Sequence, residues 1–177
     1  RLLKKIEEEG RPATPAGQTV LVKYVGWGGM PQAFDQWNVP REWQGVRADL
    51  EGLLTAEEFA SARASTPNAH YTSPQIITAM WNAMERLGLR AGGSLLEPSM
   101  GVGHFFGLMP ETLQEGTRRT GIELDAITGR IATLLYPTAH VTVAGFETVR
   151  LPDNFFDAAI SNVPFGNYGI HDPRYRK

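Results

Sequence analysis

The chain has 177 residues, 42% of them hydrophobic, which is enough for one sizeable core with an extension. Its net charge of −2 and isoelectric point near 6.1 exclude the strongly basic composition of a protein that holds nucleic acid through bulk charge. The sequence has no cysteine, which excludes disulfides and thiolate metal sites, and no apolar run of about 18 residues that could span a membrane.

The first 66 residues are expected to form an N-terminal extension. Residues 1–9 favour a short amphipathic helix, residues 11–19 a linker rich in Pro, Gly and Thr, and residues 20–25 a short β-branched strand. The chain begins with Arg1 and carries no signal-peptide pattern. We therefore expect it to be a piece of a longer protein.

A glycine-rich turn and a capped helix complete the extension. Residues 26–31 hold three glycines around Trp27 and must turn; Trp27 is expected to pack on the core, the alternative being a mobile flap that carries one large ring. Thr55 and Glu58 match a capping box, which predicts a helix to about Ala64.

Residues 67–177 are predicted to form the main domain. Apolar patterns of helix and strand length alternate along it. Helices are expected at 74–87, 105–113 (interrupted by Pro110) and 126–136, and strands at 94–97, 119–124, 140–144 and 156–160. This alternation predicts an α/β fold with a mostly parallel sheet and helices on both faces.

The stretch from Leu95 to Phe106 is the strongest local signal. A short buried strand runs into a turn with Gly101 and Gly103, and a helix follows. Such glycines let the backbone approach a ligand closely, and the amides at the start of a helix favour a negatively charged or carboxylate-bearing group. Ligands of open α/β sheets bind at the carboxyl ends of strands, where this turn falls. The alternative is an ordinary tight turn between strand and helix.

Two acidic residues at strand ends narrow the class of ligand. Glu123 follows Gly103 by 20 positions, the spacing at which a carboxylate accepts hydrogen bonds from ribose hydroxyls. A nicotinamide dehydrogenase shares this layout, although its third glycine would fall at Phe106. Glu97, directly before the turn, suits a cationic amino group. A nucleoside joined to an amino acid is S-adenosylmethionine.

The end of the fourth predicted strand offers groups for an acceptor. The Asn162 side-chain oxygen and a neighbouring backbone carbonyl can accept both hydrogens of a planar amino group. Phe165 offers a stacking face worth roughly 1–3 kcal/mol to a base. The alternative is a plain turn after a strand, where Asn and Pro are common.

The order of these motifs resembles the N6-adenine DNA methyltransferases, in the arrangement of their γ-class. With the glycine-rich turn included, it looks like the large methylase–helicase proteins of phages and conjugative elements. The motifs that carry the resemblance are Gly26-Trp27-Gly28-Gly29, Ala69-His70-Tyr71-Thr72-Ser73-Pro74, Glu97-Pro98-x-x-Gly101-x-Gly103-x-Phe105, Gly121-Ile122-Glu123-Leu124-Asp125 and Asn162-Val163-Pro164-Phe165-Gly166.

The resemblance implies a Rossmann-like class I S-adenosylmethionine-dependent methyltransferase fold, truncated after the fourth strand, with S-adenosylmethionine as cofactor. It implies that Asn162 and the Val163 carbonyl hold the target amine, and that Phe165, after Pro164, stacks on a flipped-out adenine. The cofactor residues that it implies are Tyr71, Thr72, Pro74, Glu97, Pro98, Gly101, Gly103, Phe105, Glu123 and Phe146.

It further implies adenine-N6 methylation of DNA, with DNA bound largely through regions outside this chain, a helicase domain in the same polypeptide, and a bacterial cytoplasmic location, encoded by a phage or plasmid. The sequence departs from the family in two places. Val163 stands where the family has a proline, and Gly145-Phe146 where it has Asp-Phe, with Glu147 as a stand-in for the acid. The alternatives are methylation of RNA or protein glutamine, or a non-catalytic adaptor that keeps the fold.

Overall fold

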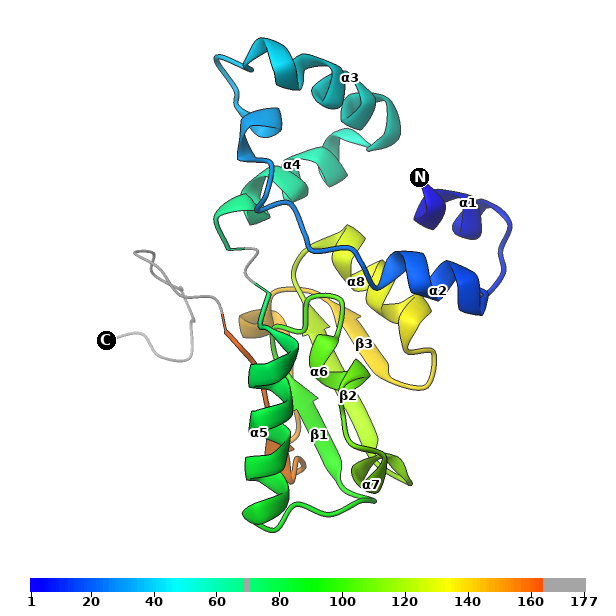
Figure 1. The fold of residues 1–177 in the computed structure, drawn as a ribbon, viewed down its shortest axis with the longest axis vertical. Coiled ribbons are helices and arrows are strands. Elements are labelled where there is room, and N and C mark those ends of the chain that lie inside the picture. Colours follow the sequence, from blue (N-terminus) through cyan, green and yellow to red (C-terminus); the bar gives the residue numbers. More distant parts are fainter. Residues whose placement is uncertain (69–70, 164–177) are drawn as a thin grey trace.

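The computed structural model describes residues 1–68 and 71–163, drawn in colour in Figure 1. Within these residues no helix is long and apolar enough to cross a membrane. The α-helices are α1 (Leu2–Glu8), α2 (Pro15–Leu21), α3 (Gln44–Leu53), α4 (Ala56–Ser65), α5 (Pro74–Arg86), α6 (His104–Gly107), α7 (Glu111–Gln114) and α8 (Ala126–Leu135). The strands are β1 (Ser94–Glu97), β2 (Arg118–Glu123), β3 (His140–Val143) and β4 (Ala158–Ala159), and the 3₁₀ helices are η1 (Pro31–Phe34), η2 (Arg41–Trp43), η3 (Thr66–Asn68) and η4 (Phe146–Thr148).

The strands form one parallel sheet in the order β3-β2-β1-β4. Leu96 pairs with Thr120 of β2 on one side and with Ala159 of β4 on the other. The chain moves outward from β1 to β3 and then returns to place β4 on the opposite side of β1. The topological switch point therefore lies between β1 and β4, where open α/β sheets bind ligands. The predicted α/β fold with a Rossmann-like parallel sheet is confirmed.

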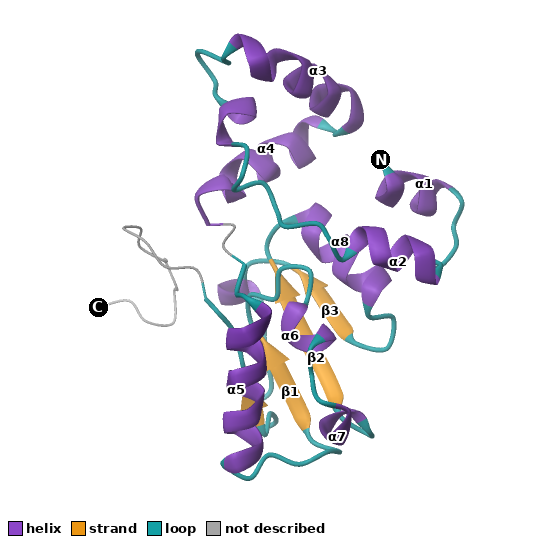
Figure 2. Ribbon diagram, viewed as in Figure 1, coloured by secondary structure: helices purple, strands orange, loops and turns teal. Residues whose placement is uncertain are grey.

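The predicted helices on both faces of the sheet are not found in the described part of the chain. The connections β1–β2 and β2–β3 step in the same direction, and because such crossovers are right-handed, α6, α7 and α8 lie on one face (Figure 2). Helix α5 joins this layer, since Ile77 and Trp81 pack with Phe105 of α6. The return from β3 to β4 contains only η4. The prediction was wrong because alternation of elements does not say which face each connection takes.

Helix α2 replaces the linker and strand that the sequence predicted for residues 11–25. Thr14 accepts a hydrogen bond from the Gly17 N–H (3.1 Å), and Pro15 occupies the first helical position. Leu21, at the end of α2, is buried and packs with α8. The cap and this tertiary burial outweigh the strand preference of the valines.

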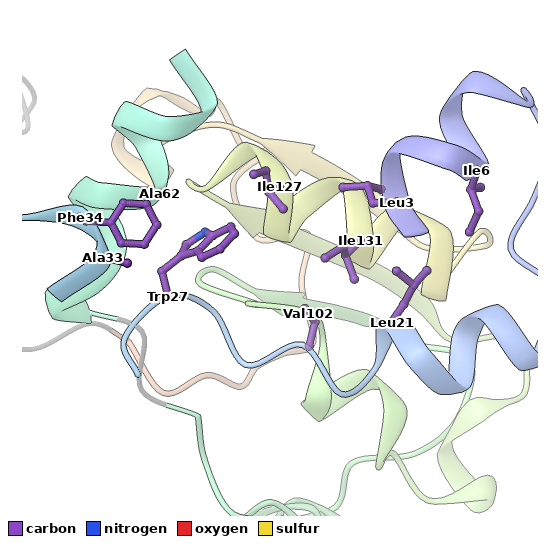
Figure 3. Close-up of a cluster of buried hydrophobic side chains, with 10 residues drawn as sticks. All are labelled: Leu3, Ile6, Leu21, Trp27, Ala33, Phe34, Ala62, Val102, Ile127 and Ile131. Atoms are coloured by element: carbon purple, nitrogen blue, oxygen red, sulfur yellow. The ribbon is translucent and has the colours of Figure 1, made fainter. Parts of the chain in front are cut away.

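The N-terminal segments pack on α8 rather than on the sheet (Figure 3). Trp27 lies between Phe34 and Ile127 and contacts Phe34 edge to face at 5.5 Å. The prediction that Trp27 packs on the core is confirmed. The predicted capping box of α4 is also present, with the Thr55 hydroxyl accepting from the Glu58 N–H and the Glu58 carboxylate accepting from the Thr55 N–H.

Candidate functional site

The turn after β1 has the left-handed conformation that its glycines permit. Gly101 has φ of 56° and Gly103 has φ of 82°. A Cβ on Gly101 would lie 3.2 Å from the Tyr71 ring, and a Cβ on Gly103 would overlap the ring of Tyr136. Gly103 thus allows close packing against the end of α8, whereas Gly101 faces Tyr71 and the pocket described below.

Glu123, the last residue of β2, reaches across to this turn. Its carboxylate accepts hydrogen bonds from the N–H groups of Gly101 and Asp125, both at 2.8 Å. Burial raises the pKa of Glu123, and these two hydrogen bonds partly offset that rise. A carboxylate fixed by two backbone donors keeps further lone pairs for a ligand.

Glu97, the last residue of β1, is only 1% exposed. Its Oε2 atom has no hydrogen-bond partner among the described residues. Burial raises the pKa of Glu97 well above its ordinary value, and the nearby Glu123 carboxyl raises it further. An unpaired buried carboxyl costs free energy, so it indicates a group that a ligand is meant to satisfy.

One pocket of about 310 Å³ brings these groups together, at the lower end of the size range of small-molecule sites. Seven of the predicted site residues line it, namely Tyr71, Thr72, Glu97, Gly101, Phe105, Glu123 and Asn162. Three of them lie at the carboxyl ends of different strands: Glu97 and Glu123 are the last residues of β1 and β2, and Asn162 comes shortly after β4. Asn162 is exposed as well as lining the pocket, which places it at the mouth.

Other predicted site residues lie apart from this lining. Pro74 begins α5, and Pro98 follows Glu97 without lining the pocket. Phe146, in η4, and Val163 are 43% and 55% exposed. Pro164 and Phe165 lie outside the described residues.

Sequence reasoning missed much of the lining. Gly26, Ser61, Ala64 and Ser65 come from the N-terminal segments, and Ile77, Ser99, Met100, His104, Leu124, Asp125 and Thr128 from the main domain. Asp125 could have been found, because an acid just before an apolar helical pattern is a typical N-cap. Its Oδ2 does accept from the Thr128 N–H at 2.9 Å. No sequence signal indicates that residues of α4 line the pocket.

The electrostatics of the pocket are one-sided. Among the described residues, its lining includes three carboxyls, those of Glu97, Glu123 and Asp125, and neither lysine nor arginine. Two of these carboxyls have raised pKa values through burial. A positively charged ligand lowers the electrostatic cost of holding these carboxyls close together. A pyrophosphate would instead be repelled by the carboxyls, with no basic side chain of the described lining to pair with it.

Comparisons with known proteins find no family model that matches. Over 99 residues the chain is 38% identical to the defense against restriction protein B of Escherichia phage P1, a match that covers 55% of this chain. The chain spans only about 4% of the length of that curated relative.

Methyltransferases are among the solved structures to which this chain is similar. The type I restriction-modification system methyltransferase subunit from Streptococcus thermophilus is 15% identical, with a TM-score of 0.45 over 90% of this chain and 46% of that chain. A SAM-dependent methyltransferase from Aquifex aeolicus is 17% identical, with a TM-score of 0.37 over 51% of this chain and 57% of that chain.

Proposed function

We propose that this chain is the cofactor-binding and catalytic part of an S-adenosylmethionine-dependent methyltransferase that modifies the N6 amino group of adenine in DNA. The observation that carries the proposal is the shared pocket at the switch point, which joins Glu97, Glu123 and Asn162. A nicotinamide cofactor is disfavoured, because its pyrophosphate would enter a lining that holds three carboxyls and, in the described residues, neither lysine nor arginine.

The residues present fit S-adenosylmethionine. Glu97 has a buried, unpartnered carboxyl oxygen that suits the cationic amino group of the methionine end. Glu123, held by two backbone N–H groups, suits the ribose hydroxyls. When bound, this cofactor supplies an electrophilic methyl group on a positively charged sulfur.

The role of Asn162 follows from its place at the mouth of the pocket. There its side-chain oxygen, with the Val163 carbonyl, accepts the two hydrogens of the adenine amino group and orients the nitrogen toward the pocket. Such preorganised acceptors act without an unusual general base. The Ser161 hydroxyl donates to the Ser99 carbonyl (3.5 Å), which ties the loop after β4 to the loop after β1.

DNA is the acceptor that the motif order of this chain favours, because that order resembles the adenine DNA methyltransferases. The phage relative is named for defense against restriction. We extend the proposal to a phage- or plasmid-encoded protein in a bacterial cytoplasm, with a helicase domain in the same polypeptide. Since the chain spans about 4% of that relative, DNA contacts are assigned mainly to regions beyond it.

The test uses the polypeptide that contains this chain, incubated with methyl-labelled S-adenosylmethionine and, separately, unmethylated DNA, RNA or protein. We expect N6-methyladenine in DNA by mass spectrometry. Asn162→Ala should lower transfer by about a hundredfold or more, while calorimetry should show unchanged cofactor binding.

The matched control is Asn82→Ala, the same change at an exposed position of α5, which should leave both quantities unchanged. If the label is found only in RNA or in protein glutamine, DNA is not the acceptor and the proposal is contradicted on this point. Cofactor binding with equal transfer by the wild type and Asn162→Ala would remove Asn162 from the reaction.

A further inference from the structure

The pocket is completed by segments that precede the main domain. We call residues 1–66 the N-terminal lobe. From this lobe Gly26 and three residues of α4 (Ser61, Ala64 and Ser65) line the pocket together with the strand-end carboxyls. The lobe is therefore positioned to touch whatever ligand the pocket holds.

A chain of hydrogen bonds joins α4 to the floor of the pocket. The Ser61 hydroxyl donates to Asp125 Oδ1 at 3.1 Å. The N–H of Asp125 in turn donates to Glu123 Oε1 at 2.8 Å, and Glu123 accepts from the Gly101 N–H at the other oxygen. Asp125 is only 3% exposed, so the Ser61 bond is made away from bulk water.

An ionic contact also joins α4 to α8. Glu58, three residues before Ser61 on α4, binds Arg130 of α8 and also accepts from Lys4 of α1 at 2.6 Å. Helix α4 is thus attached to α8 at two places, at its N-cap residue Asp125 and at Arg130. This double attachment holds the pocket-lining end of α4 in a defined position.

Small side chains keep the space beside α4 open. Ala64 is exposed, lines the pocket and lies near the carboxyl end of α4. A larger side chain there would project into the cavity without entering the packed core. The size of residue 64 therefore limits the size of ligand that the pocket accepts.

From these contacts we infer that the N-terminal lobe forms one wall of the cofactor site and that the strand ends of the main domain form the other. Ser61 is a positioning residue that acts on Glu123 through Asp125, and Ala64 is a steric determinant for the ligand. The identity of the ligand, S-adenosylmethionine, rests on the proposed function. The wall itself rests on the lining and on the Ser61–Asp125–Glu123 contacts.

The first test is steric. Ala64→Phe should weaken S-adenosylmethionine binding, measured by calorimetry on this chain, by about tenfold or more, with little change in thermal stability. Ala60→Phe is the matched control, since Ala60 is also exposed on α4 but does not line the pocket. It should bind as the wild type does.

The second test concerns positioning. Ser61→Ala should raise the Kd for S-adenosylmethionine several-fold, and Ser61→Thr, which keeps the hydroxyl, should restore it. A purely structural role would lower the thermal stability of Ser61→Ala without this rescue of affinity.

The outcomes separate the two proposals. If the wild type binds S-adenosylmethionine and Ala64→Phe binds it equally well, the wall is overturned while the proposed function stands. If the wild type does not bind it, the proposed function is overturned, and the wall, as a wall of that cofactor's site, falls with it.

Discussion

At the scale of single residues, Glu97 bears most directly on function. A carboxyl that is 1% exposed, with one oxygen unpartnered among the described residues, weakens the fold in the absence of a ligand. The cost is explained if the cationic group of a ligand pairs with this carboxyl. Binding sites commonly keep such a cost in stability because the bound state uses the group.

The pH dependence of stability tests this reading of Glu97. The pKa of Glu97 is raised in the folded protein, so folding favours the protonated carboxyl. The stability of the wild type is therefore full below the unfolded pKa and decreases as pH rises through the folded pKa. Glu97→Gln avoids that loss. At pH 7 it should unfold with a free energy about 1–3 kcal/mol larger than the wild type, and the difference should vanish near pH 4.

Urea unfolding from pH 4 to 8, without ligand, measures this difference. Glu115→Gln, at an exposed position, serves as the control and should follow the wild type at every pH. A Glu97→Gln protein that is less stable than the wild type at pH 7 would mean that Glu97 has a stabilising partner in the free protein.

What the sequence could predict at this scale depended on local spacing. Glu97 and Gly101 are close in the chain. Glu123 follows Gly103 by 20 positions, which places it at the end of the next parallel strand, where a carboxylate can bind a ribose. The Ser61–Asp125 contact joins residues 64 positions apart, so no periodicity or motif reports it. Gly103 was predicted as a ligand-approach glycine, yet the structure places Tyr136 where its Cβ would lie.

At the scale of elements, α4 shows how a short helix is held in place. Burial alone would raise the pKa of Glu58, but hydrogen bonds from Lys4, Arg130 and the Thr55 N–H outweigh it and lower the pKa to about 2. One carboxylate thereby caps α4 and connects it to α1 and α8.

The lowered pKa of Glu58 predicts acid sensitivity. Its stabilising contribution is fully present above the unfolded pKa, near 4.5, and is lost as pH falls toward about 2. Glu58→Gln should cost about 2–3 kcal/mol at pH 7, because the partly exposed Lys4 and Arg130 lose this carboxylate, although Arg130 keeps Glu7 as a partner. The loss should shrink as pH falls below about 4.5.

Thermal or urea unfolding between pH 7 and 3 measures this loss. Glu57→Gln, at the exposed neighbouring position of the same helix, should change stability by less than about 0.5 kcal/mol. A pH-independent cost for Glu58→Gln would assign it to packing rather than to charge.

Elements were predicted well where caps and breakers frame them, as at α4, α5 and β1. Helix α2 was mistaken for a linker and strand because Val20 and Val22 favour strands, while its stability comes from the Thr14 cap and from packing on α8. Helix α3 (Gln44–Leu53) was missed because no capping side chain marks its start and none of its residues is buried.

At the scale of the whole molecule, the predicted division into residues 1–66 and 67–177 separates two parts that share one pocket. The lobe supplies Gly26 and part of α4, and the main domain supplies the strand ends. Sequence reasoning located the strand ends because apolar runs, the turns that bound them and the acids at their ends are visible in the local sequence. It could not locate the lobe, whose position depends on side-chain contacts between distant segments.

Calorimetric titration of this chain with S-adenosylmethionine, for the wild type and Glu123→Ala, tests most directly whether the pocket binds this cofactor. We expect one site per chain in the wild type, and an affinity at least about tenfold weaker in Glu123→Ala because the carboxyl for the ribose is gone. The contradicting results are absence of binding by the wild type, or equal affinity of the two proteins.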